Sequence, residues 1–320
     1  MSWLYKSLDE ETNPEYGKEP EKRSLEELIN TSIVIVDKPS GPTSHQISYW
    51  LKDLTKVKKT GHIGTLDPFA TGVLPTLIGK STRLLPLFQK LDKEYVGIMH
   101  LHKDYDLDSL NEFVQKFFVG EIIQVPPKRS AVARVPRKRK VYEAYLIEKD
   151  GKDVLFRIIC ESGFYVRKWV HDIGQKLKIG AHLKELRRIS IGKYEKEYFR
   201  IFQEEKAHNL IEIADALINK DEKKIREIFV PAEFCLPHIK KIFVKDSAIP
   251  NLLNGAPLYV SGIVRLQDNI QKDEVVAIFS LKNELVAFGY AKMSSQEIIK
   301  AEKGIAVRID RVFMEKGTYK

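Results

Sequence analysis

The sequence predicts an α+β protein with two folded parts, a larger domain on a mixed or antiparallel sheet and a small C-terminal β-barrel. Three observations favour this. Strand-like runs alternate with a few amphipathic stretches, without the regular βαβ spacing of a parallel fold. Beyond about residue 238 the segments become short, β-rich and punctuated by glycine. A length of 320 residues suits about two domains.

The elements can be taken in chain order. Residues 1–30 are polar and charged, which predicts an N-terminal extension. SIVIVD, from residue 32, predicts a strand, and the KPSGP sequence predicts the turn after it. Thr43 and Gln46 have the spacing of a helix capping box. The apolar residues that follow lie at helical spacing: Ile47, Trp50, Leu51 and Leu54.

The rest of the larger domain reads mainly as strands. The β-like runs are KEYVGIMHLH, VYEAYLIEKDG, KDVLFRIICES and FYVRKWV, with one helical stretch, SLNEFVQKFFVG. KWVHDIGQKLKIGAHLKELRR has the spacing of a helix punctuated by glycine. Charged amphipathic helices and the prolines of VPAEFCLPH then mark a boundary, which predicts domains at 31–230 and 238–315. Ser294 and Glu297 predict a capped helix within the second domain.

The charge of the chain indicates a polyanionic partner. Lys and Arg number 53 against 44 Asp and Glu, a net charge of +9, and such an excess favours nucleic acid. PPKRSAVARVPRKRKVY holds much of the excess and no acid. We expect it to be an arm that grips a nucleic-acid backbone, although a solvated loop is the alternative. The expected contacts are Lys128, Arg129, Arg137, Lys138, Arg139 and Lys140.

Several classes of protein are disfavoured by the sequence. No run approaches the roughly 20 apolar residues that span a bilayer, so no membrane association is expected. The N-terminal segment lacks the apolar core of a secretory signal. Cys160 and Cys235 lie too far apart for a disulfide framework or a metal knuckle, which indicates a reducing compartment. His45, His171 and His182 show no metal-ligand spacing with a cysteine or acid, so we expect no metal.

GHIGTLDPFATGVLPTLIGKSTRL, from residue 61, is rich in glycine but fits no nucleotide-binding loop. Its glycines are too widely spaced for G-x-x-x-x-G-K-[ST], and no dinucleotide fingerprint is present. The remaining interpretation is one carboxylate on a stiff loop. Asp67 precedes Pro68, which restricts its backbone to extended geometry, and the glycines permit tight bends. An ordinary turn aspartate is the alternative.

The same segment resembles the signature GHxGTLDPxATGVLP of the TruB family of RNA pseudouridine synthases. Other blocks similar to the family's occur in order: KPSGPTS, KEYVG, QVPPKRSAV, SGFYVRKWVHDIG and AHLKELRRISIG. The C-terminal part resembles a PUA domain, an RNA-binding β-barrel. The acidic TDTxDxxG stretch of bacterial stand-alone enzymes is missing after KEYVGIMHLH, and lysine-rich tails are absent. The chain therefore most resembles the archaeal form of the dyskerin branch, the catalytic subunit of H/ACA guide-RNA particles.

The resemblance implies isomerisation of uridine to pseudouridine without metal or cofactor. Asp67 would be catalytic, either as a nucleophile toward the sugar or as a base and electrostatic partner. Tyr95 would stack on the flipped base, and Arg167 would pair with Asp67. Leu186 would form an apolar wall of the pocket, and His62 would lie near the nucleotide. Without the resemblance, each of these four residues has an ordinary structural interpretation, which for Leu186 is a helix core position.

The resemblance also implies partners. They are an H/ACA guide RNA, small particle proteins, and ribosomal or transfer RNA as substrate, in the cytoplasm of an archaeal cell. The segment FATGVLPTLIGKST is closer to the bacterial form of the motif than to some archaeal forms. A stand-alone enzyme that acts on the transfer-RNA T-loop is therefore the first alternative. A non-catalytic RNA-binding scaffold is the second alternative.

Overall fold

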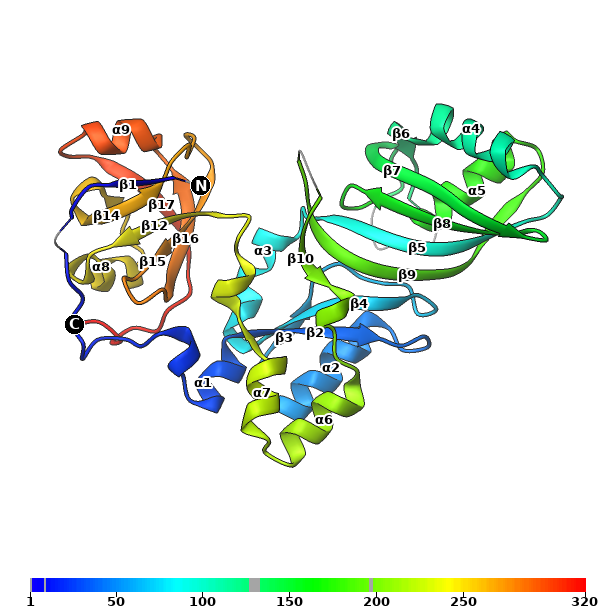
Figure 1. Cartoon of the computed structure of the whole chain (residues 1–320). Coiled ribbons are helices and arrows are strands. Elements are labelled where there is room, and N and C mark those ends of the chain that lie inside the picture. The colour runs from blue at the N-terminus through cyan, green and yellow to red at the C-terminus, as the bar shows by residue number, and fades with distance from the viewer. Residues whose placement is uncertain (1, 9, 127–132, 196–197) are drawn as a thin grey trace.

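The structure, a computed structural model, describes residues 2–8, 10–126, 133–195 and 198–320. These residues form two sheets flanked by short helices, and Figure 1 shows the smaller sheet to the left of the larger one. The α+β prediction is confirmed. Within the part of the chain described, no helix combines the length and apolar character needed to cross a membrane.

The larger sheet joins segments from most of the first 231 residues. Its strand order is β11 (Val230–Pro231), β2 (Ser32–Lys38), β4 (Thr71–Ile78), β9 (Ala181–Tyr194), β5 (Asp92–Leu101), β8 (Asp153–Cys160), β7 (Arg137–Asp150) and β6 (Gly120–Gln124). In addition, β3 (Thr60–His62) pairs with β4 and β10 (Tyr198–Gln203) pairs with β9. The central pair β5–β9 is antiparallel, whereas β4 and β9 run parallel at Gly72 and Arg188.

Two groups of helices cover this sheet at different places (Figure 1). Helices α4 (Leu107–Phe118) and α5 (Val166–Lys176) pack on β5, β7 and β8 around the buried Trp169 and Phe156. Helices α2 (Ser44–Thr55), α6 (Leu210–Ile218) and α7 (Glu222–Ile228) pack against β2 and β4. The predicted Thr43–Gln46 capping box of α2 is present in the structure.

Two local predictions in the larger domain are wrong. FYVRKWV is not a strand, because α5 begins at Val166, and its buried Val166, Trp169 and Ile173 have helical spacing. AHLKELRR is not helical, because it lies in β9. The pairing of β5 with β9 skips Lys184, and this bulge brings Leu183 and Leu186 to the same core cluster three residues apart. A bulged strand can therefore imitate the period of a helix.

The smaller sheet forms the C-terminal part. Its order is β1 (Trp3–Tyr5), β14 (Ile263–Gln267), β12 (Lys240–Val244), β15 (Val275–Phe279), β16 (Leu285–Ala291), β17 (Ile305–Val312) and β13 (Leu258–Tyr259). Helices α8 (Ile249–Leu253) and α9 (Ser295–Lys300) pack on it, and the Ser294–Glu297 capping box is present. One buried cluster is common to both sheets, since Phe88 and Phe202 lie in it with Phe243 and Phe279. This apolar interface fixes the orientation of the smaller sheet relative to the larger one.

The N-terminal residues join both parts of the molecule. Strand β1 pairs with β14 as an edge strand of the smaller sheet. Farther along, Lys282 Nζ donates to the carbonyl oxygens of Asn13 and Pro14, each at 3.0 Å. The chain then reaches α1 (Leu25–Asn30), which begins at a capping box of Ser24 and Glu27. The segment expected to be an extension thus crosses from one sheet to the other.

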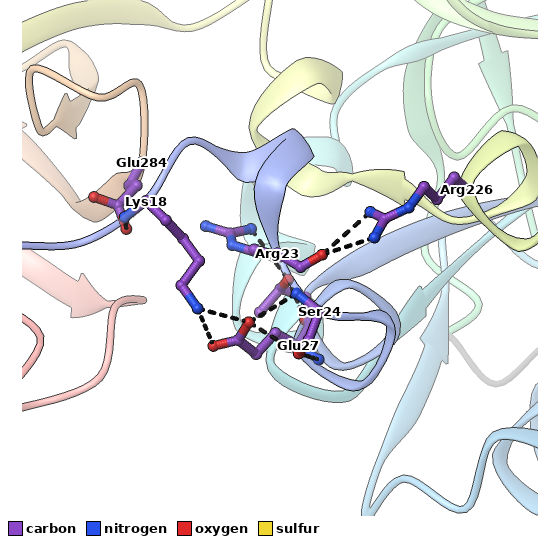
Figure 2. A network of polar contacts seen from close by, with 7 residues as sticks. Lys18, Arg23, Ser24, Glu27, Arg226 and Glu284 are labelled. Atoms are coloured by element: carbon purple, nitrogen blue, oxygen red, sulfur yellow. Dashed lines mark hydrogen bonds and ion pairs between the residues drawn. The ribbon is translucent and has the colours of Figure 1, made fainter. Parts of the chain in front are cut away.

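Figure 2 shows the polar contacts where this segment meets the larger domain. Arg226 of α7 donates to the carbonyl oxygen of Arg23 with two guanidinium nitrogens, both at 3.1 Å. The Arg23 guanidinium lies 2.7 Å from the Glu233 carboxylate, and their side chains are only 11% and 1% exposed. Glu233 also accepts from the backbone N–H of Leu285, at the start of β16, at 3.3 Å. One buried ion pair therefore ties the N-terminal segment to the junction between the two sheets.

We predict that Arg23→Met destabilises the protein by about 3–5 kcal/mol, because it leaves the Glu233 carboxylate buried without its cation. Lys18→Met is the matched control, since the Lys18–Glu27 pair is almost half exposed at 47% and 46% and should contribute less than about 1 kcal/mol. Urea unfolding measures both. Equal, small effects would show that the buried pair does not hold the segment.

Candidate active site

The loop between β3 and β4 presents Asp67 to the first turn of α5. The Asp67 carboxylate lies 3.3 Å from the Arg167 guanidinium, and the side chains are 40% and 47% exposed. These two residues are 100 positions apart in the chain, and the structure brings them together as expected. The pair is accessible to a ligand, which a buried structural ion pair would not be.

The backbone on both sides of Asp67 is held by side chains from β2 and α2. Ser44 Oγ accepts from the Leu66 N–H at 2.9 Å and donates to the Leu66 carbonyl at 3.1 Å. Lys38 Nζ donates to the carbonyl oxygens of Pro68 at 3.0 Å and Ala70 at 2.7 Å. The Lys38 residue is fully buried, and its burial lowers the pKa of the ammonium, an effect that the Asp67 charge opposes. These contacts show that Lys38 supports the backbone of the Asp67 loop.

Arg188, on β9, holds the loop from the other side. It is 1% exposed, and its guanidinium donates to the carbonyl oxygens of Gly64 and Val73, both at 2.8 Å. Arg188 also lies directly opposite Tyr95 in the β5–β9 pairing. Sequence analysis missed this residue. The sequence did hold one signal, because Arg188 begins the apolar run RISIG and is therefore expected to be buried. A buried cation requires several hydrogen-bond acceptors around it.

Gly72 permits the close approach of β4 to β9. Its φ of 97° lies in the region that favours glycine, and a Cβ atom there would be 2.2 Å from the Arg188 carbonyl oxygen. The parallel pairing of Gly72 with Arg188 is therefore possible only because residue 72 has no side chain.

Tyr95 and Leu186 lie in the apolar cluster beneath the loop. Tyr95 is 8% exposed and packs in the same cluster as Leu66 and Val166, which neighbour Asp67 and Arg167 in the chain. Burial raises the pKa of the Tyr95 hydroxyl. Leu186 is half-buried against this cluster, on a strand rather than on the expected helix. Tyr95 is close enough for the Asp67 charge to contribute to its raised pKa, and Leu186 packs against the same apolar cluster.

His62 lies at the other end of the Asp67 loop. Its Nδ1 is 3.1 Å from Ser48 Oγ, and its Nε2 is 3.0 Å from Thr65 Oγ1. The His45 ring meets it edge to face, with centroids 4.9 Å apart. Burial, aided by the neighbouring His45 and Arg188, lowers the pKa of His62 to about 4. The imidazole is therefore neutral at physiological pH.

Part of the expected basic arm lies in a strand. Lys128 and Arg129 lie outside the described residues. Residues 137–140 are not a loop, because they begin β7 and pair with β6. The alternation of the strand separates the half-buried Arg137 and Arg139 from the exposed Lys138 and Lys140. Gly163, in the turn before α5, approaches the Arg139 guanidinium, so this arginine lies near the start of the helix that carries Arg167.

Comparison with known families and relatives is consistent with this geometry. The TruB family pseudouridylate synthase (N terminal domain) matches residues 52–166, and the tRNA pseudouridylate synthase B C-terminal domain matches 167–237. A DKCLD (NUC011) domain matches 4–48, and a PUA domain matches 240–313. The chain is 47% identical to a "Probable tRNA pseudouridine synthase B" of Nanoarchaeum equitans, over 99% of this chain and 89% of that protein. The protein of the same name from Methanocaldococcus jannaschii is 45% identical, over 97% and 90%.

Two solved structures are similar over nearly the whole chain. One is described as the structure of an H/ACA RNP bound to a substrate RNA containing 2′-deoxyuridine, with a TM-score of 0.88, 40% identity, and coverage of 100% of this chain and 96% of that one. The other is a Cbf5-Nop10-Gar1 complex, with a TM-score of 0.88, 42% identity, and coverage of 99% and 95%.

We predict that Gly72→Ala destabilises the protein more than Gly120→Ala does. Gly120 has a similar φ of 88°, but a Cβ atom at this position would have nothing within 4 Å, so its substitution should cost only about 1–2 kcal/mol of backbone strain. Gly72→Ala adds the clash with the Arg188 carbonyl and should cost about 1–3 kcal/mol more. Urea unfolding of the two variants measures the difference. Equal losses would mean that β4 and β9 can separate without cost.

Proposed function

The chain belongs to the TruB family of pseudouridylate synthases, and we propose that it is the catalytic subunit of an archaeal H/ACA guide-RNA particle, with Asp67 at the reacting uridine. A pseudouridine synthase breaks the bond between uracil N1 and ribose C1′, turns the base and joins C5 to C1′. C5 loses a proton and N1 gains one, so the product is an isomer and no cofactor is consumed.

Asp67 is proposed as the catalytic residue. Breaking the glycosidic bond leaves positive charge at C1′, and a carboxylate can either attack that carbon or stabilise its charge. The observation that carries this proposal is the half-exposed Asp67–Arg167 pair, 3.3 Å apart, on a loop whose flanking backbone is held in place. Arg167 would hold the Asp67 carboxylate in one orientation through charge-assisted hydrogen bonds.

Tyr95, Leu186 and His62 are proposed to receive the base. A uridine in folded RNA must leave its stack before it can reach Asp67, and stacking on an aromatic ring offsets roughly 1–3 kcal/mol of that cost. The Tyr95 ring, which is 8% exposed and packed in the apolar cluster, offers a rigid edge for this contact. Leu186 would exclude water on the apolar side, and His62 would contact the nucleotide as a neutral imidazole.

The guide-dependent role is supported by the arrangement of the two sheets. Their common apolar cluster keeps the C-terminal PUA part at a set distance from Asp67, so an RNA bound to both would place its target uridine reproducibly. We propose an H/ACA guide RNA as that ligand, with small particle proteins like those in the similar complexes. The substrates would be ribosomal and transfer RNA in the archaeal cytoplasm. Arg137, Lys138, Arg139 and Lys140 would contact RNA, as would Lys128 and Arg129.

A stand-alone transfer-RNA enzyme is the second candidate. It is favoured by one observation, the name "Probable tRNA pseudouridine synthase B" carried by the archaeal relatives. Both candidates use the same site and differ in what selects the uridine.

We predict that Asp67→Asn lowers the rate of pseudouridine formation by roughly 10⁴-fold or more, since the amide neither attacks C1′ nor carries charge. RNA affinity should change by only a few fold. Asp53→Asn, at an exposed carboxylate on α2, is the control and should retain wild-type activity. Pseudouridine mapping and filter binding give the two readouts. An active Asp67→Asn enzyme would refute the assignment, and an inactive wild type in every RNA mixture would favour the scaffold alternative.

The guide-dependent role predicts that purified protein modifies ribosomal RNA only when guide RNA and the small particle proteins are added. Adding these components one at a time, with pseudouridines mapped after each addition, identifies the minimal active set. Unmodified transfer RNA incubated with the protein alone tests the second candidate. Efficient T-loop modification as the sole activity, unchanged by guide components, would overturn the guide-dependent proposal.

A further inference from the structure

Three histidines gather where the end of β5 meets the starts of β8 and β9, strands that lie side by side in Figure 1. His100 on β5 lies directly opposite His182 on β9 and Asp153 on β8. His102 follows two residues later, and its backbone N–H donates to the Gly180 carbonyl at 3.0 Å. Tyr95 is five positions back along β5, so roughly 17 Å of strand separates this cluster from the candidate active site.

The three imidazoles are close to one another and reachable from solvent. The His182 ring centroid lies 5.1 Å from that of His100 and 5.3 Å from that of His102, while the His100 and His102 centroids are 6.3 Å apart. His102 Nε2 is 3.0 Å from His182 Nδ1. His102 and His182 are exposed and His100 is partly exposed.

These separations are close to those of three imidazoles around one metal ion. Zinc–nitrogen bonds of about 2.0–2.1 Å in tetrahedral geometry place neighbouring ring centres roughly 5 Å apart. Two of the three ring separations already match, but the three rings do not yet offer one nitrogen each within 4.8 Å of one another, so metal binding requires the His102 ring to turn. The hydrogen bond between His102 and His182 would be replaced by two metal–nitrogen bonds, and the proton of that hydrogen bond would move to the other nitrogen of the donor ring, which stays neutral.

Asp153 provides the support that metal-binding histidines usually have. Its Oδ1 atom lies 2.6 Å from His100 Nδ1, which fixes the ring and leaves Nε2 available as a ligand. Its Oδ2 atom accepts from Lys184 Nζ at 2.6 Å, and Lys152 Nζ donates to the His102 carbonyl oxygen at 3.1 Å, so both neighbouring ammonium groups already have acceptors.

We propose that His100, His102 and His182 bind a divalent transition-metal ion such as Zn²⁺, with Asp153 orienting His100 and the fourth coordination position open. A second group, His208 with Glu212 and Glu227, has its donor atoms closer together. There, however, Lys224 Nζ lies 2.6 Å from Glu212 and 2.9 Å from Glu227, so a lysine already satisfies the carboxylates. That group serves as the internal control.

The test uses the full chain, freed of metal by a chelator and titrated with Co²⁺ and with Zn²⁺. We expect one ion per chain, with the visible absorption bands of low-coordinate Co²⁺. His100→Ala and His182→Ala should abolish saturable binding, and Asp153→Asn should weaken it about 10- to 100-fold. His208→Ala should bind as the wild type does.

Histidine ring NMR signals of the wild type give a readout that does not depend on variants folding. Among the 8 histidines, only those of this cluster should shift as Zn²⁺ is added. The proposal is overturned by weak, non-saturable binding, by binding that survives in the His100→Ala/His102→Ala/His182→Ala protein, or by loss of binding in His208→Ala. None of these outcomes bears on Asp67, so the pseudouridine synthase assignment is tested separately.

Discussion

Two buried cations, Lys38 and Arg188, determine how Asp67 is presented. The loop that carries Asp67 lacks a strand partner of its own, so its carbonyl groups need donors from elsewhere. Arg188 donates hydrogen bonds to the carbonyl oxygens of Gly64 and Val73. Lys38 donates to those of Pro68 and Ala70. A buried charge is tolerated only where its donors are satisfied, and these carbonyl oxygens satisfy both cations. Loop and cations therefore stabilise one another. Loss of either cation would remove a donor from carbonyl oxygens around Asp67, although the Pro68 oxygen would keep the Gly41 N–H, 2.9 Å away.

In this arrangement the Asp67 side chain is not used to hold the loop in place. The restraints from Lys38, Ser44 and Arg188 act on backbone atoms of the loop, while the Asp67 carboxylate meets the Arg167 guanidinium and stays 40% exposed. A fixed main chain with an accessible functional group is the preorganisation that electrostatic catalysis requires. Arg188 also connects the loop to Tyr95, because its guanidinium holds the loop and its backbone pairs with Tyr95 across β5 and β9. Strand β9 therefore supports both the proposed reacting group and the residue proposed to stack on the base.

Sequence reasoning succeeded where local chemistry decides structure and failed where tertiary pairing does. Thr43 with Gln46 predicted a helix start, because capping involves residues three apart. AHLKELRR misled because the bulge at Lys184 gives a strand the leucine spacing of a helix. In the candidate site, the Asp67–Arg167 proximity followed from a family resemblance and not from spacing. Arg188 was missed because its acceptors are backbone carbonyls, which no residue pattern records.

The same reason explains why the histidine cluster was not foreseen. A search for metal ligands by spacing compares neighbours in one segment, whereas His100 and His182 come from strands that are paired only in the fold. The β5–β9 pair therefore places functional groups at both ends. Near Tyr95 it carries the Arg188 that holds the Asp67 loop, and near His100 it aligns imidazoles across strands. The pairing of β5 with β9 connects the two ends, with a bulge at Lys184 between them. An ion bound at the histidines would therefore brace the free end of the pair without touching the residues around Asp67.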